Sequence, residues 1–457
     1  MMDTATAAGA VGGSVVGASV PFFRVTTDTR ALAPGDLFVA LRGDRFDGHD
    51  FVAQALSGGA AAALVARARA AGMAGNLIAV DDPLPALGAL AAFWRRRFAI
   101  PVAVVTGSNG KTSTKEMIAS IFRAAAGEEA VASTPGNFNN AIGLPLAVLA
   151  LRAPHRLAVF EIGMNHRGET RELAAIAQPT IAVITNAQRE HQEFMRSVDE
   201  VAEEHADAIR ALPASGTAVV NADDPHVDVW RNAAREGSRA VVSFGLDRPA
   251  DVFARYAPHP DGGTLDIVSP AGNAHVLLHV PGRHMAANAL AAAATAHAAG
   301  LGLTAIVQGL EAFRPVRGRL VVRRATSGAT VIDDTYNANP DSVRAAIDVL
   351  AARAAPRTLV LGDMGEVGDA GPAFHREIGE YARAAGVERL LASGALAREA
   401  TDGFGAGAEH CTSVEALIER ADAAARDGGT LLVKGSRFMR MERVVAALVG
   451  EAAGDAH

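Results

Sequence analysis

Residues 104–115, VVTGSNGKTSTK, place a glycine-rich turn between a short apolar run and a helical pattern. The run at 102–107, VAVVTG, is typical of a buried parallel strand, and we expect a helix from Thr112 to about Ala126. A glycine-rich loop between such a strand and such a helix directs backbone N–H groups and the positive helix end toward an anion. The stretch is therefore either a plain capping turn or a loop that holds the phosphates of a nucleotide.

The use of lysine in this chain favours the phosphate loop. Of the 43 basic residues, only Lys111, Lys115 and Lys434 are lysines, and the others are arginines. Arginine cannot replace a compact or nucleophilic ammonium group, so the few retained lysines are candidates for chemistry. Lys111 would contact the outer phosphates, and the hydroxyl of Thr112 would ligate Mg²⁺. A full Walker pattern has a glycine where this chain has Val105, so the loop is a shortened G-x-x-G-K-T form.

Composition indicates a folded chain of two or three domains. The 457 residues are 49% hydrophobic and 20% charged, which provides ample material for buried cores. The net charge of −7 argues against a nucleic-acid surface, and no apolar run reaches the roughly 18 residues of a membrane span. Residues 1–20 lack the basic segment of a signal peptide. The single cysteine, Cys411, excludes an intrachain disulfide and favours a cytoplasmic location.

Apolar runs alternate with helical patterns along most of the chain, which predicts βαβ units and mainly parallel sheets. The predicted fold class is α/β with three domains. These are a small α/β N-terminal domain at 1–98, a central P-loop ATPase domain with a parallel sheet at 99–316, and a Rossmann-like C-terminal domain at 317–457. Between residues 251 and 280 the pattern changes to short alternating strands with Gly/Pro turns, which predicts an antiparallel appendage of the central domain.

The phosphate loop and a series of other motifs resemble the Mur ligases, the family that builds the peptide stem of bacterial peptidoglycan. The resemblance covers nearly the whole chain in order. Its motifs are TTDTRALAPGDLFVALRGDRFDGHDF (26–51), TGSNGKTSTKEM (106–117), STPGNFNNAIGLPLAVL (133–149), FEIGMNHRGE (160–169), NADD (221–224), GRHMAANALAA (282–292), VRGR (316–319), DDTYNANPDS (333–342), LGDMGEVG (361–368) and LVKGSR (432–437). DTYNANPDS with LGDMGEVG is similar to the members that add D-alanyl-D-alanine. The D-N-P-R signature of members that add diaminopimelate is absent.

The resemblance implies an ATP-dependent amide ligase that uses ATP and Mg²⁺. It would join D-alanyl-D-alanine to UDP-N-acetylmuramoyl-tripeptide through an acyl phosphate and yield the pentapeptide precursor of peptidoglycan, which cell shape and division require. The N-terminal domain would bind the UDP substrate, and the C-terminal domain would close on ATP and bind the dipeptide. The expected protein is a cytoplasmic monomer with small-molecule substrates, without nucleic acid and without stable membrane insertion.

The resemblance also assigns site residues, position by position. The implied catalytic residues are Lys111, Glu161 and His191, and the implied metal ligands are Thr112, Glu161 and His191. The implied ATP-binding residues are Gly107, Ser108, Asn109, Gly110, Lys111, Thr112, Ser113, His284, Asn288, Arg319 and Asp334. The implied UDP-substrate-binding residues are Asp28, Thr29, Arg30, Asp47, Gly48, His49, Asn137, Asn140, Asn165 and His166. The implied dipeptide-binding residues are Asn337, Asn339, Asp363, Glu366 and Lys434.

The sequence departs from the family pattern at one position. Such members usually carry a lysine, carbamylated on its amine, that supplies a carboxylate to a second Mg²⁺, and the resemblance places His205 there. No lysine lies between positions 115 and 434. Either Glu203, Glu204 or Asp207 supplies the negative charge, or the second ion is held by His191, phosphate and water alone. We favour the first alternative because Mg²⁺ binds carboxylates far better than imidazole.

The missing lysine leads to a prediction about bicarbonate. With no lysine to carbamylate, ligase activity should be the same in CO₂-depleted buffer as in buffer with added bicarbonate. The measurement is phosphate release from ATP under the two conditions. A strong bicarbonate dependence would contradict the prediction.

Two other functions are compatible with parts of the sequence. One is a nucleotide-binding protein that kept the fold and lost catalysis, a hypothesis that the missing lysine motivates. The other is a ligase that adds a different amino acid, against which the motif YNANP (336–340) argues. Phosphate release that requires both the tripeptide nucleotide and D-alanyl-D-alanine would show an active ligase and would exclude the nucleotide-binding protein without catalysis.

Overall fold

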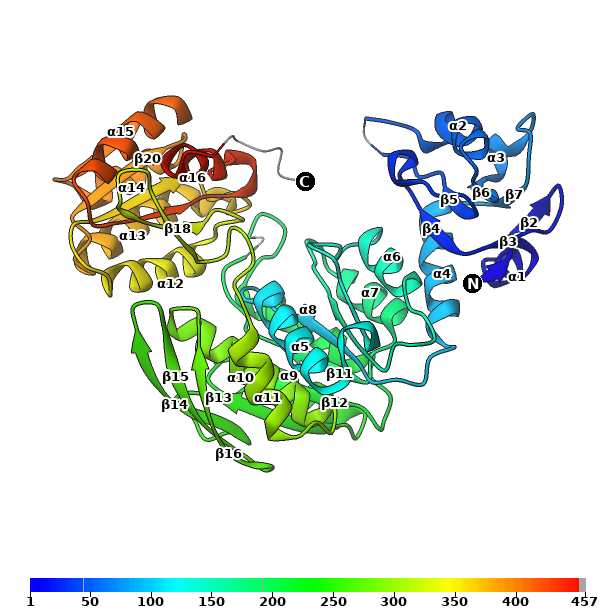
Figure 1. Cartoon of the computed structure of the whole chain (residues 1–457), viewed down its shortest axis with the longest axis horizontal. Coiled ribbons are helices and arrows are strands. Elements are labelled where there is room, and N and C mark those ends of the chain that lie inside the picture. Colours follow the sequence, from blue (N-terminus) through cyan, green and yellow to red (C-terminus); the bar gives the residue numbers. More distant parts are fainter. Residues whose placement is uncertain (44, 191, 452–457) are drawn as a thin grey trace.

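The computed structural model describes residues 1–43, 45–190 and 192–451, which form three lobes (Figure 1). The N-terminal lobe, drawn in blue, and the C-terminal lobe, drawn in yellow to red, stand on opposite sides of the central lobe. Each lobe is built on its own β-sheet with helices packed against it. This arrangement confirms the predicted three-part α/β fold.

The N-terminal lobe contains a five-stranded sheet in the order β2-β7-β6-β5-β4, in which only the β2–β7 pair is antiparallel. The strands of this sheet are β2 (Ser14–Val16), β4 (Arg24–Thr26), β5 (Asp36–Val39), β6 (Ala62–Ala66) and β7 (Leu77–Val80), and β1 (Met2–Asp3) and β3 (Pro21–Phe22) form a separate two-stranded sheet. The helices of this lobe are α1 (Thr4–Ala10), α2 (Val52–Ser57), α3 (Arg67–Ala70) and α4 (Pro83–Arg95). Helix α4 also packs against α6 and α7 of the central lobe and so joins the two lobes.

The central lobe contains a nine-stranded sheet in the order β16-β15-β14-β13-β12-β11-β8-β10-β9. The strands are β8 (Val102–Thr106), β9 (Val131–Ser133), β10 (Leu157–Glu161), β11 (Ile181–Ile184), β12 (Thr217–Asn221), β13 (Ala240–Gly245), β14 (Val252–His259), β15 (Gly262–Ser269) and β16 (Gly272–Leu278). Strands β8 to β13 pair in parallel, and β14 joins β13 in parallel. The β14–β15 and β15–β16 pairs form the antiparallel appendage that the sequence predicts. The strand order reverses at β8, and in open α/β sheets ligands bind at the carboxyl ends of the strands at such a point.

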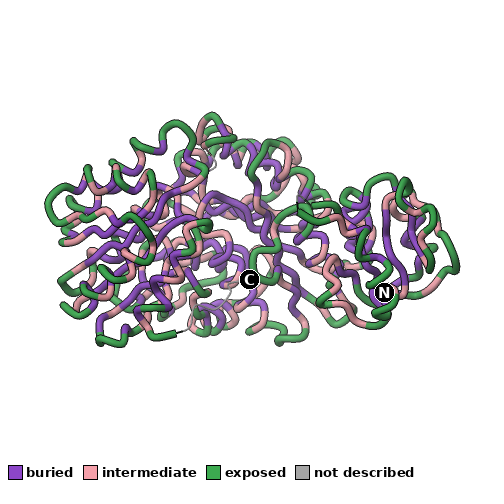
Figure 2. The backbone as a smooth tube through the Cα atoms, turned by 90° about the horizontal axis from the view of Figure 1, so that it is seen from above, coloured by how far each residue is buried: buried purple, intermediate pink, exposed green. Residues whose placement is uncertain are grey.

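Helices cover both faces of the central sheet. They are α5 (Lys111–Ala126), α6 (Gly143–Leu149), α7 (Glu169–Ala177), α8 (Val198–Arg210), α9 (Val227–Glu236), α10 (Arg283–Ala298) and α11 (Leu303–Ala312). Val102 and Val104 of β8 pack in the core on one face, and Ala103 and Val105 pack with α5 and α10 on the other. Figure 2 shows the buried backbone running through the middle of the lobes with exposed loops outside. A strand buried on both faces explains why VAVV reads as a continuous apolar run.

The C-terminal lobe contains a six-stranded sheet in the order β17-β18-β22-β19-β20-β21, with only β17 antiparallel to its neighbour. Its strands are β17 (Val321–Arg324), β18 (Thr330–Asp334), β19 (Arg357–Gly362), β20 (Arg389–Ser393), β21 (Ala408–Cys411) and β22 (Thr430–Lys434). Its helices are α12 (Pro340–Ala351), α13 (Gly371–Ala384), α14 (Ala397–Phe404), α15 (Val414–Arg426) and α16 (Glu442–Val449). The carboxyl ends of β18, β19 and β22 face the central lobe through the loops that follow them, since those loops line the cavity described below.

A buried histidine makes the stability of the C-terminal lobe depend on pH. His375 of α13 accepts a hydrogen bond from Met364 N at Nε2 (2.9 Å) and donates from Nδ1 to Gly371 O (2.7 Å), so its ring is neutral. Burial lowers the pKa of His375. Below the unfolded-state pKa of about 6.5, the unfolded chain takes up a proton that the folded chain does not, so stability falls as the pH falls.

We therefore expect His375→Gln, which does not titrate, to flatten the pH dependence of unfolding. Below pH 6.5 the free energy of unfolding of the wild-type protein should fall by up to about 1.4 kcal/mol per pH unit more than that of the variant. This extra loss should end at the lowered pKa that His375 has in the folded protein. Urea unfolding at pH 7.5 and at pH 5.5 measures the difference. If the free energy of unfolding fell equally in the two proteins, His375 would not be the cause of the pH dependence.

Candidate active site

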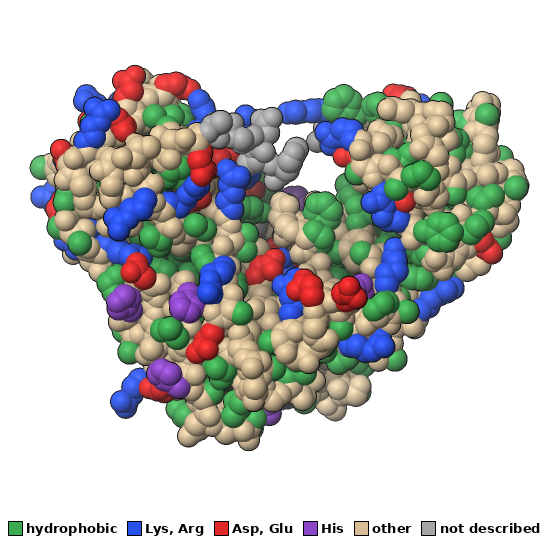
Figure 3. Space-filling model, viewed as in Figure 1, with side chains coloured by type: hydrophobic (Ala, Val, Ile, Leu, Met, Phe, Trp, Pro, Cys, Tyr) green, Lys and Arg blue, Asp and Glu red, His purple; other side chains and the backbone are tan. Residues whose placement is uncertain are grey.

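A cavity of about 1100 Å³ lies between the central and C-terminal lobes. It is lined by the phosphate loop, by residues after β10 and β11, by the start of α10 and by loops of the C-terminal lobe. Figure 3 shows an opening between the N-terminal and C-terminal lobes above the central lobe, with acidic and basic side chains near it. The cavity volume is slightly above the roughly 300–1,000 Å³ range of small-molecule sites, as expected for a site that holds more than one substrate.

Two glycines give the phosphate loop its shape. Gly107 has φ +129°, and a Cβ there would lie 2.1 Å from Thr185 Oγ1. Gly110 has φ +83°, and a Cβ there would lie 2.3 Å from Asn288 Oδ1. Only glycine combines these conformations with this close packing. Helix α5 begins directly after Gly110, at Lys111, so its unpaired N–H groups are available to an anion at the cavity.

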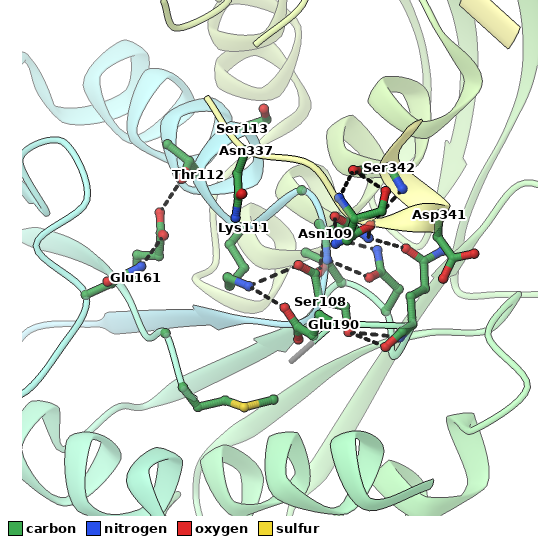
Figure 4. A pocket seen from close by; sticks show the side chains of 18 of the residues that line it. Ser108, Asn109, Lys111, Thr112, Ser113, Glu161, Glu190, Asn337, Asp341 and Ser342 are labelled. Atoms are coloured by element: carbon green, nitrogen blue, oxygen red, sulfur yellow. Dashed lines mark hydrogen bonds and ion pairs between the residues drawn. The ribbon is translucent and has the colours of Figure 1, made fainter. Parts of the chain in front are cut away.

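The Lys111 side chain folds back over its own loop. Its Nζ donates to Gly107 O (2.5 Å) and Ser108 O (3.0 Å), and lies 3.3 Å from a carboxylate oxygen of Glu190. Figure 4 shows Lys111 between Glu190 on one side and the Thr112–Glu161 pair on the other. The ammonium group is thus placed at the mouth of the loop, where phosphate groups would compete for its contacts.

Glu161 and Thr112 meet on the opposite side of the loop. Thr112 Oγ1 donates to Glu161 Oε2 (2.7 Å), and Asn139 Nδ2 donates to Glu161 Oε1 (2.8 Å). Glu161 ends β10 and is 2% exposed, yet it lines the cavity. A carboxylate and a hydroxyl side by side are the hard oxygen donors that Mg²⁺ prefers, and Mg²⁺ usually completes its coordination with water and substrate phosphate. These two residues therefore fit the ion that the family resemblance implies.

The second lysine of the loop region, Lys115, has a supporting position. It is fully buried, donates to Thr134 O (2.9 Å) and pairs with Glu116. The Thr134 hydroxyl in turn accepts a hydrogen bond from Glu161 N (3.0 Å). Lys115 therefore holds the backbone of Thr134, and the Thr134 hydroxyl holds the backbone of Glu161.

The C-terminal lobe reaches the phosphate loop directly. Arg319 Nη2 donates to Thr112 Oγ1 (2.9 Å), and its guanidinium lies 4.1 Å from the centre of the Tyr336 ring. Asn109 and Asn339 exchange two side-chain hydrogen bonds of 2.9 and 3.2 Å. The resemblance implies that Arg319 engages when the C-terminal domain closes, and in this structure the contact with the loop is made.

The third lysine lies on the C-terminal wall of the cavity. Lys434 ends β22 and donates to Asp334 Oδ2 (2.6 Å) and to Asn337 O (2.9 Å). Burial raises the pKa of the adjacent Asp333, which is bonded to the Thr335 hydroxyl. All three lysines of the chain therefore lie at the cavity or directly behind its wall.

Arg189 connects the central and C-terminal lobes and was not found from the sequence. It follows β11 and lies 2.7 Å from Asp341 and 2.7 Å from Glu377, both in the C-terminal lobe. Hydrogen bonding to Glu377 and Asp341 raises the pKa of Arg189, and the same contact lowers the pKa of Glu377. We call this group of three residues the Arg189 clasp. No sequence signal marks this group, because Asp341 and Glu377 follow Arg189 in the chain by 152 and 188 residues.

The structure corrects our interpretation of the region around His205. Glu204 accepts from Gly168 N (2.8 Å) and Thr170 N (2.9 Å) at the start of α7. Asp207 pairs with Arg171 and Arg210, and the exposed Glu203 also pairs with Arg210. These three carboxylates are engaged away from the cavity, so the expectation that one of them supplies the missing charge is wrong. The carboxylate that contacts His205 is that of Glu190, 3.2 Å away.

Most of the residues assigned to catalysis, to ATP and to the dipeptide line the cavity. Those that line it are Ser108, Asn109, Gly110, Lys111, Thr112, Ser113, Glu161, His284, Asn288, Arg319, Asp334, Asn337, Asn339, Glu366 and Lys434. Burial lowers the pKa of His284, which favours its neutral form. Asp363 has a different position: it accepts from Leu396 N and Ala397 N at the start of α14 and does not line the cavity. His191 lies outside the described residues.

The residues assigned to the UDP substrate divide into two groups. Asn137, Asn140 and Asn165 line the cavity, whereas His166 does not and packs edge-on against Phe194. The remaining six, in the N-terminal lobe, are Asp28, Thr29, Arg30, Asp47, Gly48 and His49, and none of them lines this cavity.

Within the N-terminal lobe, His49 has a structural position. Its Nε2 accepts from Ala66 N (2.9 Å), and Nδ1 lies 2.6 Å from Asp47 Oδ1. Both ring nitrogens are used and the residue is 7% exposed, so the ring itself offers no hydrogen bond to a nucleotide. Asp28 and Arg30, in contrast, form an exposed pair of 2.7 Å on the surface of the lobe.

Comparison with protein families matches all three lobes. The model of the Mur ligase family catalytic domain matches residues 23–95, the Mur ligase middle domain matches 105–296, and the Mur ligase glutamate ligase domain matches 318–437. The chain is 40% identical over 440 residues to the UDP-N-acetylmuramoyl-tripeptide--D-alanyl-D-alanine ligase of Escherichia coli, covering 95% of this chain and 96% of that protein.

Solved structures show the same architecture. A crystal structure of MurF from Acinetobacter baumannii has a TM-score of 0.91 at 33% identity and covers 98% of this chain and 99% of its own. MurF from Thermotoga maritima in complex with ADP has a TM-score of 0.82 at 27% identity and covers 94% and 97% of the two chains. Among the described residues, no helix has both the length and the hydropathy needed to cross a bilayer. On sequence, family models and structure together, the chain belongs to the Mur ligase family.

Proposed function

We propose that this protein is an ATP-dependent ligase that joins D-alanyl-D-alanine to UDP-N-acetylmuramoyl-tripeptide and yields the pentapeptide precursor of peptidoglycan. The observation that carries the proposal is 40% identity over 95% of the chain to a relative of that name. The cavity between the lobes supports it, since nucleotide-loop residues and C-terminal residues of the family motifs lie on opposite walls. With one buried cysteine and UDP-linked substrates, we assign the reaction to the cytoplasm.

The reaction needs activation of a poor electrophile. The carboxylate of the tripeptide takes the γ-phosphoryl group of ATP, ADP leaves, and the amine of the dipeptide attacks the acyl phosphate and displaces phosphate. The protein's contribution is positioning and neutralisation of charge. The N–H groups of the loop and of the first turn of α5 bind the phosphates, and Lys111 places its ammonium on the outer ones.

Thr112 and Glu161 would hold Mg²⁺. The resemblance adds His191, which lies outside the described residues. When bound, the ion would neutralise charge on the phosphates. Asn139 and Lys115 keep the Glu161 carboxylate in place from behind, through the contacts given above.

We assign the substrates to the walls of the cavity as follows. His284 and Asn288 of α10 would face adenine, and Asn137, Asn140 and Asn165 would face the tripeptide nucleotide, whose uridine would bind to the N-terminal domain at 1–98. Asn337, Asn339, Glu366 and Lys434 would face the dipeptide. Closure of the C-terminal domain at 317–457 on the central domain at 99–316 would exclude water, which would otherwise hydrolyse the acyl phosphate.

Phosphate release from ATP tests the proposal. We expect release only when the tripeptide nucleotide and D-alanyl-D-alanine are both present, with the pentapeptide nucleotide detected by mass. A panel with diaminopimelate or lysine at the third position and with other dipeptides defines the substrates. Nucleotide binding without phosphate release under any combination would indicate a protein that lost catalysis.

A further inference from the structure

A buried chain of three side chains leads from the central sheet to the phosphate-loop lysine. His205 of α8 is fully buried, and its Nδ1 lies 3.0 Å from the Thr106 hydroxyl at the end of β8. Its Nε2 lies 3.2 Å from Glu190 Oε1, and Glu190 Oε2 lies 3.3 Å from Lys111 Nζ. Glu190 is 7% exposed and lines the cavity, whereas His205 does not.

The carboxylate partner determines which ring nitrogen of His205 carries a proton. Because a carboxylate only accepts, the His205 proton lies on Nε2 and is donated to Glu190. In the neutral ring, Nδ1 then accepts the proton of the Thr106 hydroxyl. One oxygen of Glu190 is thereby held against the protein interior, and the other is directed toward Lys111. His205 is fixed at both ring nitrogens, so the position of the Glu190 carboxylate is fixed as well.

A second carboxylate therefore lies at the phosphate end of the cavity. Glu161 lies on one side of Lys111 and Glu190 on the other (Figure 4). A buried carboxylate is costly unless it is paired and hydrogen-bonded, and Glu190 has both an ammonium and a histidine beside it. Phosphate groups that bind Lys111 would compete with Glu190 for its ammonium group, so the Glu190 oxygen that now faces Lys111 would face the cation that accompanies the phosphates.

We infer that Glu190, positioned by His205, is a ligand for the divalent cation that accompanies the nucleotide phosphates, on the side of Lys111 opposite to Glu161. This inference rests on the proposed function only in taking a metal–nucleotide as the ligand. With this role, Glu190 supplies a negative charge at the phosphate end of the cavity in a chain that has no lysine between positions 115 and 434. The carboxylate is genetically encoded, so it needs no carbon dioxide. Glu190 contacts the ligand, and His205 is a positioning residue that acts through Glu190.

Metal binding to the protein with a non-hydrolysable ATP analogue tests the inference without turnover. The probe is Mn²⁺, whose free concentration is read by electron paramagnetic resonance. We expect Glu190→Gln to weaken Mn²⁺ binding by about 10-fold or more. Binding of the analogue without metal should be unchanged or tighter, because a negative charge near the phosphates is removed. Unchanged Mn²⁺ affinity in Glu190→Gln would overturn the inference.

Glu172→Gln is the matched control. Glu172 lines the same cavity and the substitution makes the same change of charge, but it is exposed at the first turn of α7 and has no contact with Lys111. We expect its Mn²⁺ affinity to stay within about twofold of wild type, as for a solvent-screened surface charge. An equal loss in both variants would mean that the effect is only the net charge of the cavity, and would overturn the assignment to Glu190.

Two substitutions of His205 test its positioning role. His205→Leu removes the donor to Glu190 and should weaken Mn²⁺ binding as Glu190→Gln does, whereas His205→Gln keeps an N–H donor and should recover part of the affinity. A purely structural role predicts that the two variants differ in thermal stability and not in Mn²⁺ affinity.

If Glu190→Gln does not fold, Glu190→Asp, which keeps the charge, should bind Mn²⁺ more weakly than wild type. Failure of wild-type phosphate release with both substrates would instead count against the proposed function and leave these binding results unaffected.

Discussion

Replacement of Lys111 by methionine should lower the rate of phosphate release by about 10³-fold, the upper range for loss of a single positioned charge or donor at a transition state. Lys111 Nζ now contacts two loop carbonyls and Glu190, all at the mouth of the loop. No other lysine of this chain can replace it, because Lys115 is fully buried behind Glu161 and Lys434 is bonded to Asp334. The measurement is coupled phosphate release with both substrates at saturation.

Lys111→Arg is the sharper variant of the same experiment. It keeps the charge, but the planar guanidinium is larger and cannot donate to the two loop carbonyls and a phosphate in the same compact geometry. We expect activity close to that of Lys111→Met, with thermal stability close to wild type. If Lys111→Arg kept more than about a tenth of the activity, the ammonium would not be the reason that lysine is retained here.

Reversal of charge at Arg189 should lower kcat by about 10²-fold, as expected for a catalytic group displaced by about 1 Å. Arg189→Glu places three carboxylates together where the Arg189 clasp now holds Asp341 and Glu377 at 2.7 Å. Like charges at this distance repel, so the C-terminal lobe should move away from the phosphate loop. The Arg319–Thr112 and Asn109–Asn339 contacts would then be lost.

Two measurements separate this effect from a general loss of stability. Small-angle scattering should show a larger radius of gyration for Arg189→Glu, and limited proteolysis should cut faster between the lobes, near residues 313–320. Arg171→Glu is the matched control, because Arg171 pairs with Asp207 inside the central lobe. If Arg171→Glu lowered kcat as much as Arg189→Glu, the clasp would not be the cause.

The local parts of the site could be predicted from the sequence because each is continuous in the chain. Strand, glycine turn, Lys111 and helix lie within 25 residues, so their geometry follows from backbone preferences and helix-end electrostatics. The antiparallel appendage was predicted for the same reason, from alternation and turn residues at 251–280. The family and the three-part α/β fold were also predicted, since the motifs occur in order along nearly the whole chain.

The errors concern side chains whose partners are distant in sequence. His205 and the carboxylates at 203, 204 and 207 share one helix, and adjacency suggested that they act together. Their directions are decided by tertiary packing: Glu204 turns to the start of α7, 34 residues away, and Asp207 turns to Arg171. Asp363 shows the same effect, since its motif suggested a ligand contact and its carboxylate caps α14.

The sequence by itself therefore determined the fold class, the family and the phosphate loop, because periodicity, turn chemistry and ordered motifs are properties of short segments. Only the tertiary structure decided which carboxylate faces Lys111 and what holds the lobes together. Glu190 lies 79 residues from Lys111 and 15 from His205, and the Arg189 clasp spans 152 and 188 residues. Contacts at such separations are made by the packing of whole strands and helices, and no short pattern records them.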